Sequence, residues 1–250
     1  MDFIDAIESR ISCRAFSEKA IEPEKIEALR DVIAQANAQQ DLHFELYGPD
    51  DFGGTLALNS NMFASSPAWY AALAAPDDLL SKERIGYYGE LLVLTAAQLG
   101  LQSCWVAGTF DRKATYAQLA EGEVLHDVIP LGYGAEKIPL KQRTIRKGLR
   151  ARSKKQQALY DGPTPLPEAP EWIQACIDGV WKAPSAINEQ PVVFAWSGEG
   201  TSVRAQLPNV KSGMEYTDLG IAKLHFELVA RACGIDGIWE WGAGGAFVLS

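Results

Sequence analysis

The sequence has few of the residues that build metal sites and disulfide frameworks. Its 250 residues include only four cysteines and three histidines. The cysteines are widely separated and form no C-x-x-C pair, whereas zinc and iron–sulfur sites use closely spaced ligands. We therefore expect no metal site, and we expect the cysteines to be reduced, which is typical of a cytoplasmic protein.

Long apolar runs and an excess of positive charge are also missing. No stretch has the length of a membrane-spanning helix, and two acidic residues precede the first apolar run, so we predict neither a membrane span nor a signal peptide. Asp and Glu number 32 against 23 Lys and Arg, which gives a net charge of -9. A surface of this sign repels nucleic acid and anionic lipid. We expect neither as a partner, and an anionic ligand would need a local basic cluster.

An internal repeat organises the chain. The stretch Gly86 to Trp105 (GYYGELLVLTAAQLGLQSCW) aligns without a gap on Gly220 to Trp239 (GIAKLHFELVARACGIDGIW). Each copy reads as an apolar helix, at 86–99 and 220–233, that stops at a glycine before a short strand near the tryptophan.

A second, shorter match precedes the first in both copies. Residues 26–36 align on 173–183, and each predicted helix leads into a predicted strand, at 43–48 and 192–198. Two matches in the same order predict a duplicated helix–strand–helix–strand unit.

The two copies are joined by an unusual segment. A run rich in Lys and Arg over 141–155 is followed by a proline-rich stretch at 160–170 that prevents regular structure. We predict an α+β fold of two duplicated halves, 1–150 and 151–250, packed about a pseudo-twofold axis. Such a chain is expected to be a monomer that imitates a dimer.

The first group of candidate binding residues follows the N-terminal helix pattern. Arg10, Ser12 and Arg14 alternate where that pattern ends. Two guanidinium groups and a hydroxyl suit a phosphomonoester and a polar ring edge. Spacing alone leaves a solvated helix end as the alternative.

The second group lies on a loop in the second half. Pro184 and Ser185 stop a helix, and Asn188 and Gln190 precede a proline and a strand. Their neutral donors and acceptors suit the heteroatom edge or the ribityl hydroxyls of a flavin. The alternative is a loop capped by its own polar side chains.

Together these segments resemble the nitroreductase family of FMN-dependent oxidoreductases. The Arg10-Ile-Ser12-Cys-Arg14 motif, the P-S-A-I-N-E-Q-P loop and the G-L-Q-S-C-W helix ending match its pattern, as does G-Y-G with basic residues behind it. Ordinary members carry the loop soon after the arginine motif, but here it occurs only in the second half. The resemblance therefore points to a fused branch of the family, in which the first half supplies the residues that bind the phosphate and the second half supplies the loop. One site would be intact and its mirror site empty.

The resemblance also implies a role for each candidate residue. Arg10, Ser12 and Arg146 would hold the FMN phosphate, and Arg14 would lie nearer the pyrimidine edge. The loop would contact the ribityl chain and ring edge, and a backbone segment without a bulky side chain would approach flavin N5. These last two sets are Pro184, Ser185, Asn188 and Gln190 in the loop, and Ala107 and Gly108 in the backbone segment.

The implied activity is ping-pong hydride transfer from NADH or NADPH to a nitroaromatic compound, a quinone or a similar small molecule. The chemistry would belong to the flavin, so we assign no catalytic side chain. Two other hypotheses remain open: a flavin-binding regulatory module without turnover, and a scaffold without flavin whose basic run binds an acidic partner. NAD(P)H consumption separates the first from an enzyme, and flavin loss on Arg10→Ala counts against the second.

Overall fold

The computed structural model describes all residues except 40, 52–55, 59–62, 66, 201 and 250. These residues form two compact units. The first comprises 1–81 and 91–148, and the second comprises 82–90 and 149–250. The chain thus divides close to residue 150, but a short helical segment of the first half belongs to the second unit. The division into halves 1–150 and 151–250 stays a prediction.

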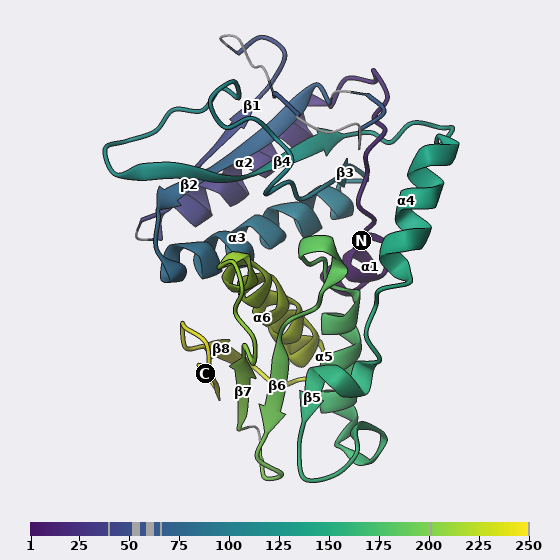
Figure 1. Ribbon diagram of the computed structural model, residues 1–250, viewed down its shortest axis with the longest axis vertical. Helices are drawn as coiled ribbons and strands as arrows, with labels where there is room; N and C mark the ends of the chain where they lie inside the picture. Colours follow the sequence, from purple (N-terminus) through teal and green to yellow (C-terminus); the bar gives the residue numbers. More distant parts are fainter. Residues whose placement is uncertain (40, 52–55, 59–62, 66, 201, 250) are drawn as a thin grey trace. The chain divides into compact units, whose positions relative to one another are not determined.

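The first unit is built on a four-stranded antiparallel sheet in the order β1-β2-β4-β3. Helix α2 lies along one face of this sheet (Figure 1). Helices α3 and α4 begin in this unit and continue into residues of the second. The elements are α1 (Phe3–Ser9), α2 (Pro23–Asn37), β1 (His43–Tyr47), β2 (Trp69–Pro76), α3 (Leu79–Gln98), β3 (Gln102–Ser103), β4 (Glu123–Gly132) and α4 (Leu140–Arg150).

The second unit pairs two helices, α5 and α6, with a five-stranded sheet in the order β5-β6-β7-β9-β8. Stacked rings of Phe194 and Phe226, with centroids 4.9 Å apart, lie in its core beside Trp239. The main elements are β5 (Tyr160–Asp161), α5 (Glu171–Lys182), β6 (Val193–Trp196), β7 (Val203–Gln206), α6 (Met214–Ala232), β8 (Gly237–Trp239) and β9 (Ala246–Leu249), and the short 3-10 turns are Gln156–Leu159, Leu166–Glu168 and Ala186–Asn188.

The element order confirms the duplication. From α2 to β4 the chain runs helix–strand–strand–helix–strand–strand, and it does so again from α5 to β9. The pairing is also repeated, because β1-β2-β4-β3 has the same order as β6-β7-β9-β8.

The predicted repeat unit was too short by two strands in each half. Strands β2 and β4 are buried along almost their whole length. They therefore lack the alternation of apolar and polar residues that reveals a half-exposed strand.

Two glycines that the repeat aligns allow α6 and the 82–90 segment to touch backbone to backbone. A Cβ atom added to Gly220 would lie 1.8 Å from the Glu83 carbonyl oxygen, and one added to Gly86 would lie 1.9 Å from that of Thr217. Continued towards the N-terminus, the same gapless alignment pairs Glu83 with Thr217. The two close approaches are therefore equivalent, as in the isologous contact of a symmetric dimer.

Buried charges surround this helix crossing. The Lys223 Nζ atom lies 2.5 Å from Glu83 Oε1, and both side chains are fully buried. Lys223 also donates to the carbonyl oxygens of Glu240 and Gly242, at 2.8 and 3.0 Å. Burial lowers the pKa of Lys223, and the Glu83 carboxylate partly offsets that change. The ion pair thus links the helix crossing to the loop that precedes β9.

No helix in the described part of the chain combines the length and the apolar character needed to cross a bilayer.

Candidate functional site

The arginine motif begins where α1 ends and continues as extended chain. The Asp2 carboxylate caps the helix by accepting from the Asp5 amide at 2.8 Å. Beyond the helix, Ser12 forms a parallel bridge with Ser103 of β3. Alternate residues of an extended segment point to opposite sides. This explains why Cys13 is buried while the predicted residues around it are half-buried; they are Arg10, Ser12 and Arg14.

A buried thiol shows that three of the predicted residues lie close together. Burial raises the pKa of Cys104, and the guanidinium groups of Arg14 and Arg10 partly offset the rise, together with a hydrogen bond involving Ser12. Cys104 follows β3 directly, so the motif and this strand end form one neighbourhood.

A second thiol brings in Arg146, the remaining predicted phosphate ligand. Burial raises the pKa of Cys13, and the positive charges of Arg146 and Arg14 are among the effects that oppose the rise. Arg146 lies on α4, far along the sequence from the motif. No salt bridge of Arg14 or Arg146 is found among the described residues. The first unit therefore brings several cationic side chains together, and no salt bridge within the described residues balances the charges of Arg14 and Arg146.

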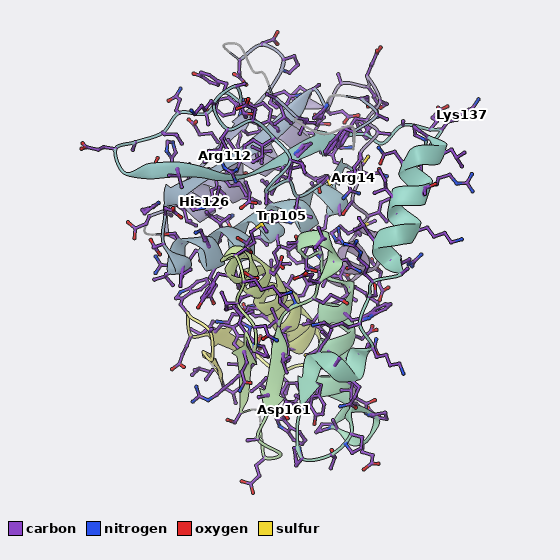
Figure 2. The ribbon with its side chains drawn as sticks, in the orientation of Figure 1. Arg14, Trp105, Arg112, His126, Lys137 and Asp161 are labelled. Carbon is purple, nitrogen blue, oxygen red and sulfur yellow. The ribbon has the colours of Figure 1, made fainter. Side chains whose placement is uncertain are left out.

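The backbone predicted to face a flavin ring lies in the same unit. Val106 and Val128 exchange two backbone hydrogen bonds of 3.0 Å, so the chain is held against β4 just before Ala107. Gly108 is exposed, and a Cβ atom added to it would meet nothing within 4 Å. Figure 2 labels Arg14, Trp105 and Arg112, which all belong to this unit.

In the second unit, the Gln190 side chain is buried and binds protein groups at both ends. Its Oε1 atom accepts from the Lys154 amide at 2.8 Å, and its Nε2 atom donates to the Trp181 carbonyl at 2.8 Å. The Gln190 amide donates to Ser185 Oγ at 2.9 Å. Hydrogen bonds of Gln190 therefore hold this loop to itself and to the chain on either side.

Asn188 and its neighbours have a strained backbone. The φ angles of Ile187, Asn188 and Gln190 are 45°, 60° and 48°, in the left-handed region that residues with a side chain rarely adopt. Hydrogen bonds hold this shape: Asn188 Nδ2 donates to the Leu149 carbonyl and to Ser153 Oγ, both at 2.9 Å. Strain of this kind is kept when surrounding contacts fix the loop, and it clusters at functional sites.

A small cavity lies beside this loop. Its volume is about 10 Å³, and Pro184, Ser185, Gln190 and Asp218 are among the residues that line it. That volume holds at most about one water molecule. The cavity by itself is therefore too small to hold a flavin.

The structure thus brings four predicted residues into one basic neighbourhood, and it places the backbone at Ala107 and Gly108 in the same unit. It places the predicted loop in the second unit. That these groups contact a flavin stays a prediction. The four neighbouring residues are Arg10, Ser12, Arg14 and Arg146, and those of the loop are Pro184, Ser185, Asn188 and Gln190.

Two residues that hold the candidate segments in place were not predicted from the sequence. Asp218 of α6 accepts from the Ala186 amide at 2.9 Å and so anchors the strained loop. Arg112 binds three backbone carbonyls around the Ala107 segment. Neither belongs to a recognisable motif. In the described part of the chain, no cluster of His, Cys, Asp and Glu residues is arranged to hold a metal ion.

Residues 2–230 match the model of the protein family described as "Putative TM nitroreductase". The chain belongs to this nitroreductase family. No curated protein matches this nitroreductase-family chain.

A solved structure shows the same fold. A Thermotoga maritima protein described in the same terms as the family is 20% identical, with a TM-score of 0.65, and the match covers 100% of this chain and 93% of that one. The predicted α+β nitroreductase-like fold is therefore confirmed.

Two further similar structures cover little more than half of the chain. A nitroreductase family protein from Clostridium novyi is 18% identical over 54% of this chain and 87% of its own, with a TM-score of 0.46. A nitroreductase with bound FMN from Bacteroides fragilis is 19% identical over 56% of this chain and 92% of its own, with a TM-score of 0.43.

Proposed function

We propose that this nitroreductase-family chain is an FMN-dependent oxidoreductase that uses NADH or NADPH to reduce a nitroaromatic compound, a quinone or a similar small acceptor. When bound, FMN would supply the hydride transfer itself. The protein's own residues would hold the phosphate, orient the ring and leave one ring face accessible.

The convergence of four predicted binding residues, three of them predicted phosphate ligands, carries this proposal. Arg10, Ser12 and Arg14 lie in one short segment, and Arg146 approaches it from α4. A phosphomonoester dianion needs several charge-assisted hydrogen bonds. A cationic cluster is unusual in a chain with a net charge of -9, and an anionic ligand gives it a physical reason.

The Gly108 backbone supports a ring site in the same unit. The space beside its Cα atom is open, so a flat ring can approach the main chain there. Arg14 would place positive charge near the pyrimidine edge, where it favours the reduced, anionic form of a flavin.

From the second half, we propose that Ser185 and Asn188 contact the flavin. The Ser185 hydroxyl accepts one hydrogen bond and still has a proton to donate, and the Asn188 amide keeps its acceptor oxygen. Because both ends of the Gln190 side chain bind protein groups, we assign Gln190 the task of holding the loop.

We further propose that one chain is the functional unit. The equivalent approaches at Gly86 and Gly220 already repeat the contact that a symmetric dimer would make. Size-exclusion chromatography with light scattering would give the mass of one chain.

Titrations with FMN and with riboflavin test whether Arg146 binds the phosphate. Arg146→Ala should weaken FMN binding by about tenfold or more, because one charge-assisted hydrogen bond contributes roughly 1.5–3 kcal/mol. Riboflavin, which lacks the phosphate, should bind the variant and the natural protein equally well. Arg30→Ala is the control, since Arg30 pairs with Glu27 on the exposed side of α2. Equal losses for FMN and riboflavin would contradict the assignment of Arg146.

Turnover separates the enzyme from the alternative functions. We expect NADH or NADPH to be consumed when a nitroaromatic compound or a quinone is added to the FMN-loaded protein. FMN binding without consumption would instead favour a flavin-binding regulatory module. A chain that takes up no FMN would leave the scaffold hypothesis.

A further inference from the structure

We propose that Arg112 is a positioning residue that aims a backbone N–H group at the flavin ring. The Arg112 side chain binds three carbonyl oxygens: Nε donates to Leu125 at 2.9 Å, and Nη2 donates to Ala107 at 2.8 Å and to His126 at 2.9 Å. Its guanidinium also lies 4.8 Å from the centre of the Phe110 ring. One side chain thus fastens the segment after Val106 to strand β4.

The fastening fixes the orientation of the next peptide group. A trans peptide is planar, so the carbonyl of Ala107 and the N–H of Gly108 point in opposite directions. With the carbonyl turned towards Arg112, the N–H is turned away from it. No described residue accepts a hydrogen bond from the Gly108 amide. A directed donor therefore lies beside the open space at Gly108.

This geometry matches the chemistry expected at that position. The inference rests on the proposed function, in which the backbone at Ala107 and Gly108 approaches flavin N5, an acceptor in the oxidised ring. A backbone donor binds such an acceptor more tightly if its peptide group is already held in the required orientation. Holding the Ala107 carbonyl removes that freedom before the ring arrives, which lowers the entropy lost on binding.

The planar shape of arginine matters as much as its charge. A guanidinium presents five N–H donors in a rigid fork, whereas a lysine ammonium is a point charge on a flexible chain. Lysine at position 112 would keep the positive charge but would not hold all three carbonyl oxygens from a rigid fork. A comparison of Arg112→Ala with Arg112→Lys therefore separates the effect of the three hydrogen bonds from that of the positive charge.

The test is a titration of cofactor-free protein with FMN and with riboflavin, and the absorption spectrum of the bound flavin is recorded as well. We expect Arg112→Ala to weaken the binding of both flavins by the same factor of about ten. That factor corresponds to the loss of one hydrogen bond of about 1.4 kcal/mol. On a logarithmic scale, Arg112→Lys should restore less than half of the flavin affinity that Arg112→Ala loses. Both variants should shift the long-wavelength band of bound flavin, because the ring has lost a donor.

Arg204→Ala is the matched control. Arg204 is also exposed and donates to a backbone carbonyl, that of Gly244, at 2.8 Å, but it lies in the second unit. We expect this variant to leave both affinities and the absorption band unchanged. The lysine variant of Arg112 keeps the test decisive if Arg112→Ala does not fold.

Four outcomes would overturn the inference. Unchanged affinities and an unmoved band in both Arg112 variants would do so while leaving the proposed function intact, and so would a lower melting temperature as the sole effect. A loss for FMN but not for riboflavin would assign Arg112 to the phosphate instead. If the natural protein takes up no FMN, the inference and the proposed function fail together.

Discussion

Replacing Gly220 by alanine tests whether the two repeated helices are held in backbone contact. The added Cβ atom would lie 1.8 Å from the Glu83 carbonyl oxygen and 2.6 Å from the Tyr87 nitrogen, whereas real Cβ atoms keep at least 3.0 Å from such neighbours. Both obstacles are main-chain atoms of a helix, which cannot rotate away. Helix α6 and the 82–90 segment must therefore separate by more than about 1 Å, since packed interiors yield little.

The separation has two energetic costs and one small gain. Overpacking a core costs roughly 1–3 kcal/mol, and more where backbone must move. Moving the helices also strains the buried Lys223–Glu83 pair, and a fully broken buried pair costs about 3–5 kcal/mol. Alanine returns up to about 1 kcal/mol through its higher helix propensity. We expect a net loss of roughly 3 kcal/mol, a large share of a typical stability of about 5–15 kcal/mol.

Urea unfolding followed by tryptophan fluorescence measures this loss, because Trp239 lies in the core of the same unit. Gly148→Ala in α4 is the control, since a Cβ atom there would meet nothing within 4 Å. It should leave stability unchanged or raise it by up to about 1 kcal/mol. Gly86→Ala should be as damaging as Gly220→Ala, and the double variant should be less than additive because both open one crossing.

A loss below about 1 kcal/mol for Gly220→Ala would contradict the predicted clash, since that is the lower end of the overpacking range. It would mean that the two backbones are not in contact at this point. The equivalence of the two halves at the crossing would then have no energetic basis.

Substitutions at Lys223, Tyr133 and Gly108 test other features of the structure. Lys223→Met should lower stability by roughly 3–5 kcal/mol in urea, because it leaves the Glu83 carboxylate buried and unpaired, and adding Glu83→Met should restore part of the loss. The Tyr133 hydroxyl is the main cause that lowers the pKa of Glu22 from 4.5 to about 2. A lowered carboxylate pKa adds stability that is present above the ordinary value and is lost as the pH falls towards 2, so Tyr133→Phe should raise the Glu22 pKa in an NMR titration; an unmoved pKa would contradict the contact. Gly108→Val should abolish FMN uptake without lowering the melting temperature, because its side chain fills open space; full uptake would exclude a close approach of the ring.

The ends of helices α3 and α6 were predictable because a glycine follows each helix, and this signal needs no tertiary context. Gly100 and Gly234 follow α3 and α6 with φ angles of 76° and 80°, which only glycine adopts without strain. The predicted stops are therefore correct. The starts were less accurate, because α3 begins at Leu79 and α6 at Met214, ahead of the aligned segments.

The missed strands have a different cause. Strand β2 reads WYAALAAP, and alanine has a low preference for strands. Its six central residues are buried between β1 and β4, so burial in the finished sheet decides their structure. That information is not local, and a single sequence does not carry it.

The candidate site was predictable only where residue type implies chemistry. An alternation of Arg10, Ser12 and Arg14 points to an anion, and the structure brings Arg146 to the same place. The partners of Gln190 could not be foreseen, because Lys154 and Trp181 reach it from separate parts of the chain.

If one chain builds one FMN site, the flavin content of the purified protein will show it. The protein would be purified without added cofactor, its visible spectrum taken, and any flavin released by denaturation identified by mass. We predict a yellow protein that releases FMN in a ratio close to one per chain. A ratio close to two would contradict the single site, and a colourless protein that also fails to take up added FMN would contradict the flavin assignment itself.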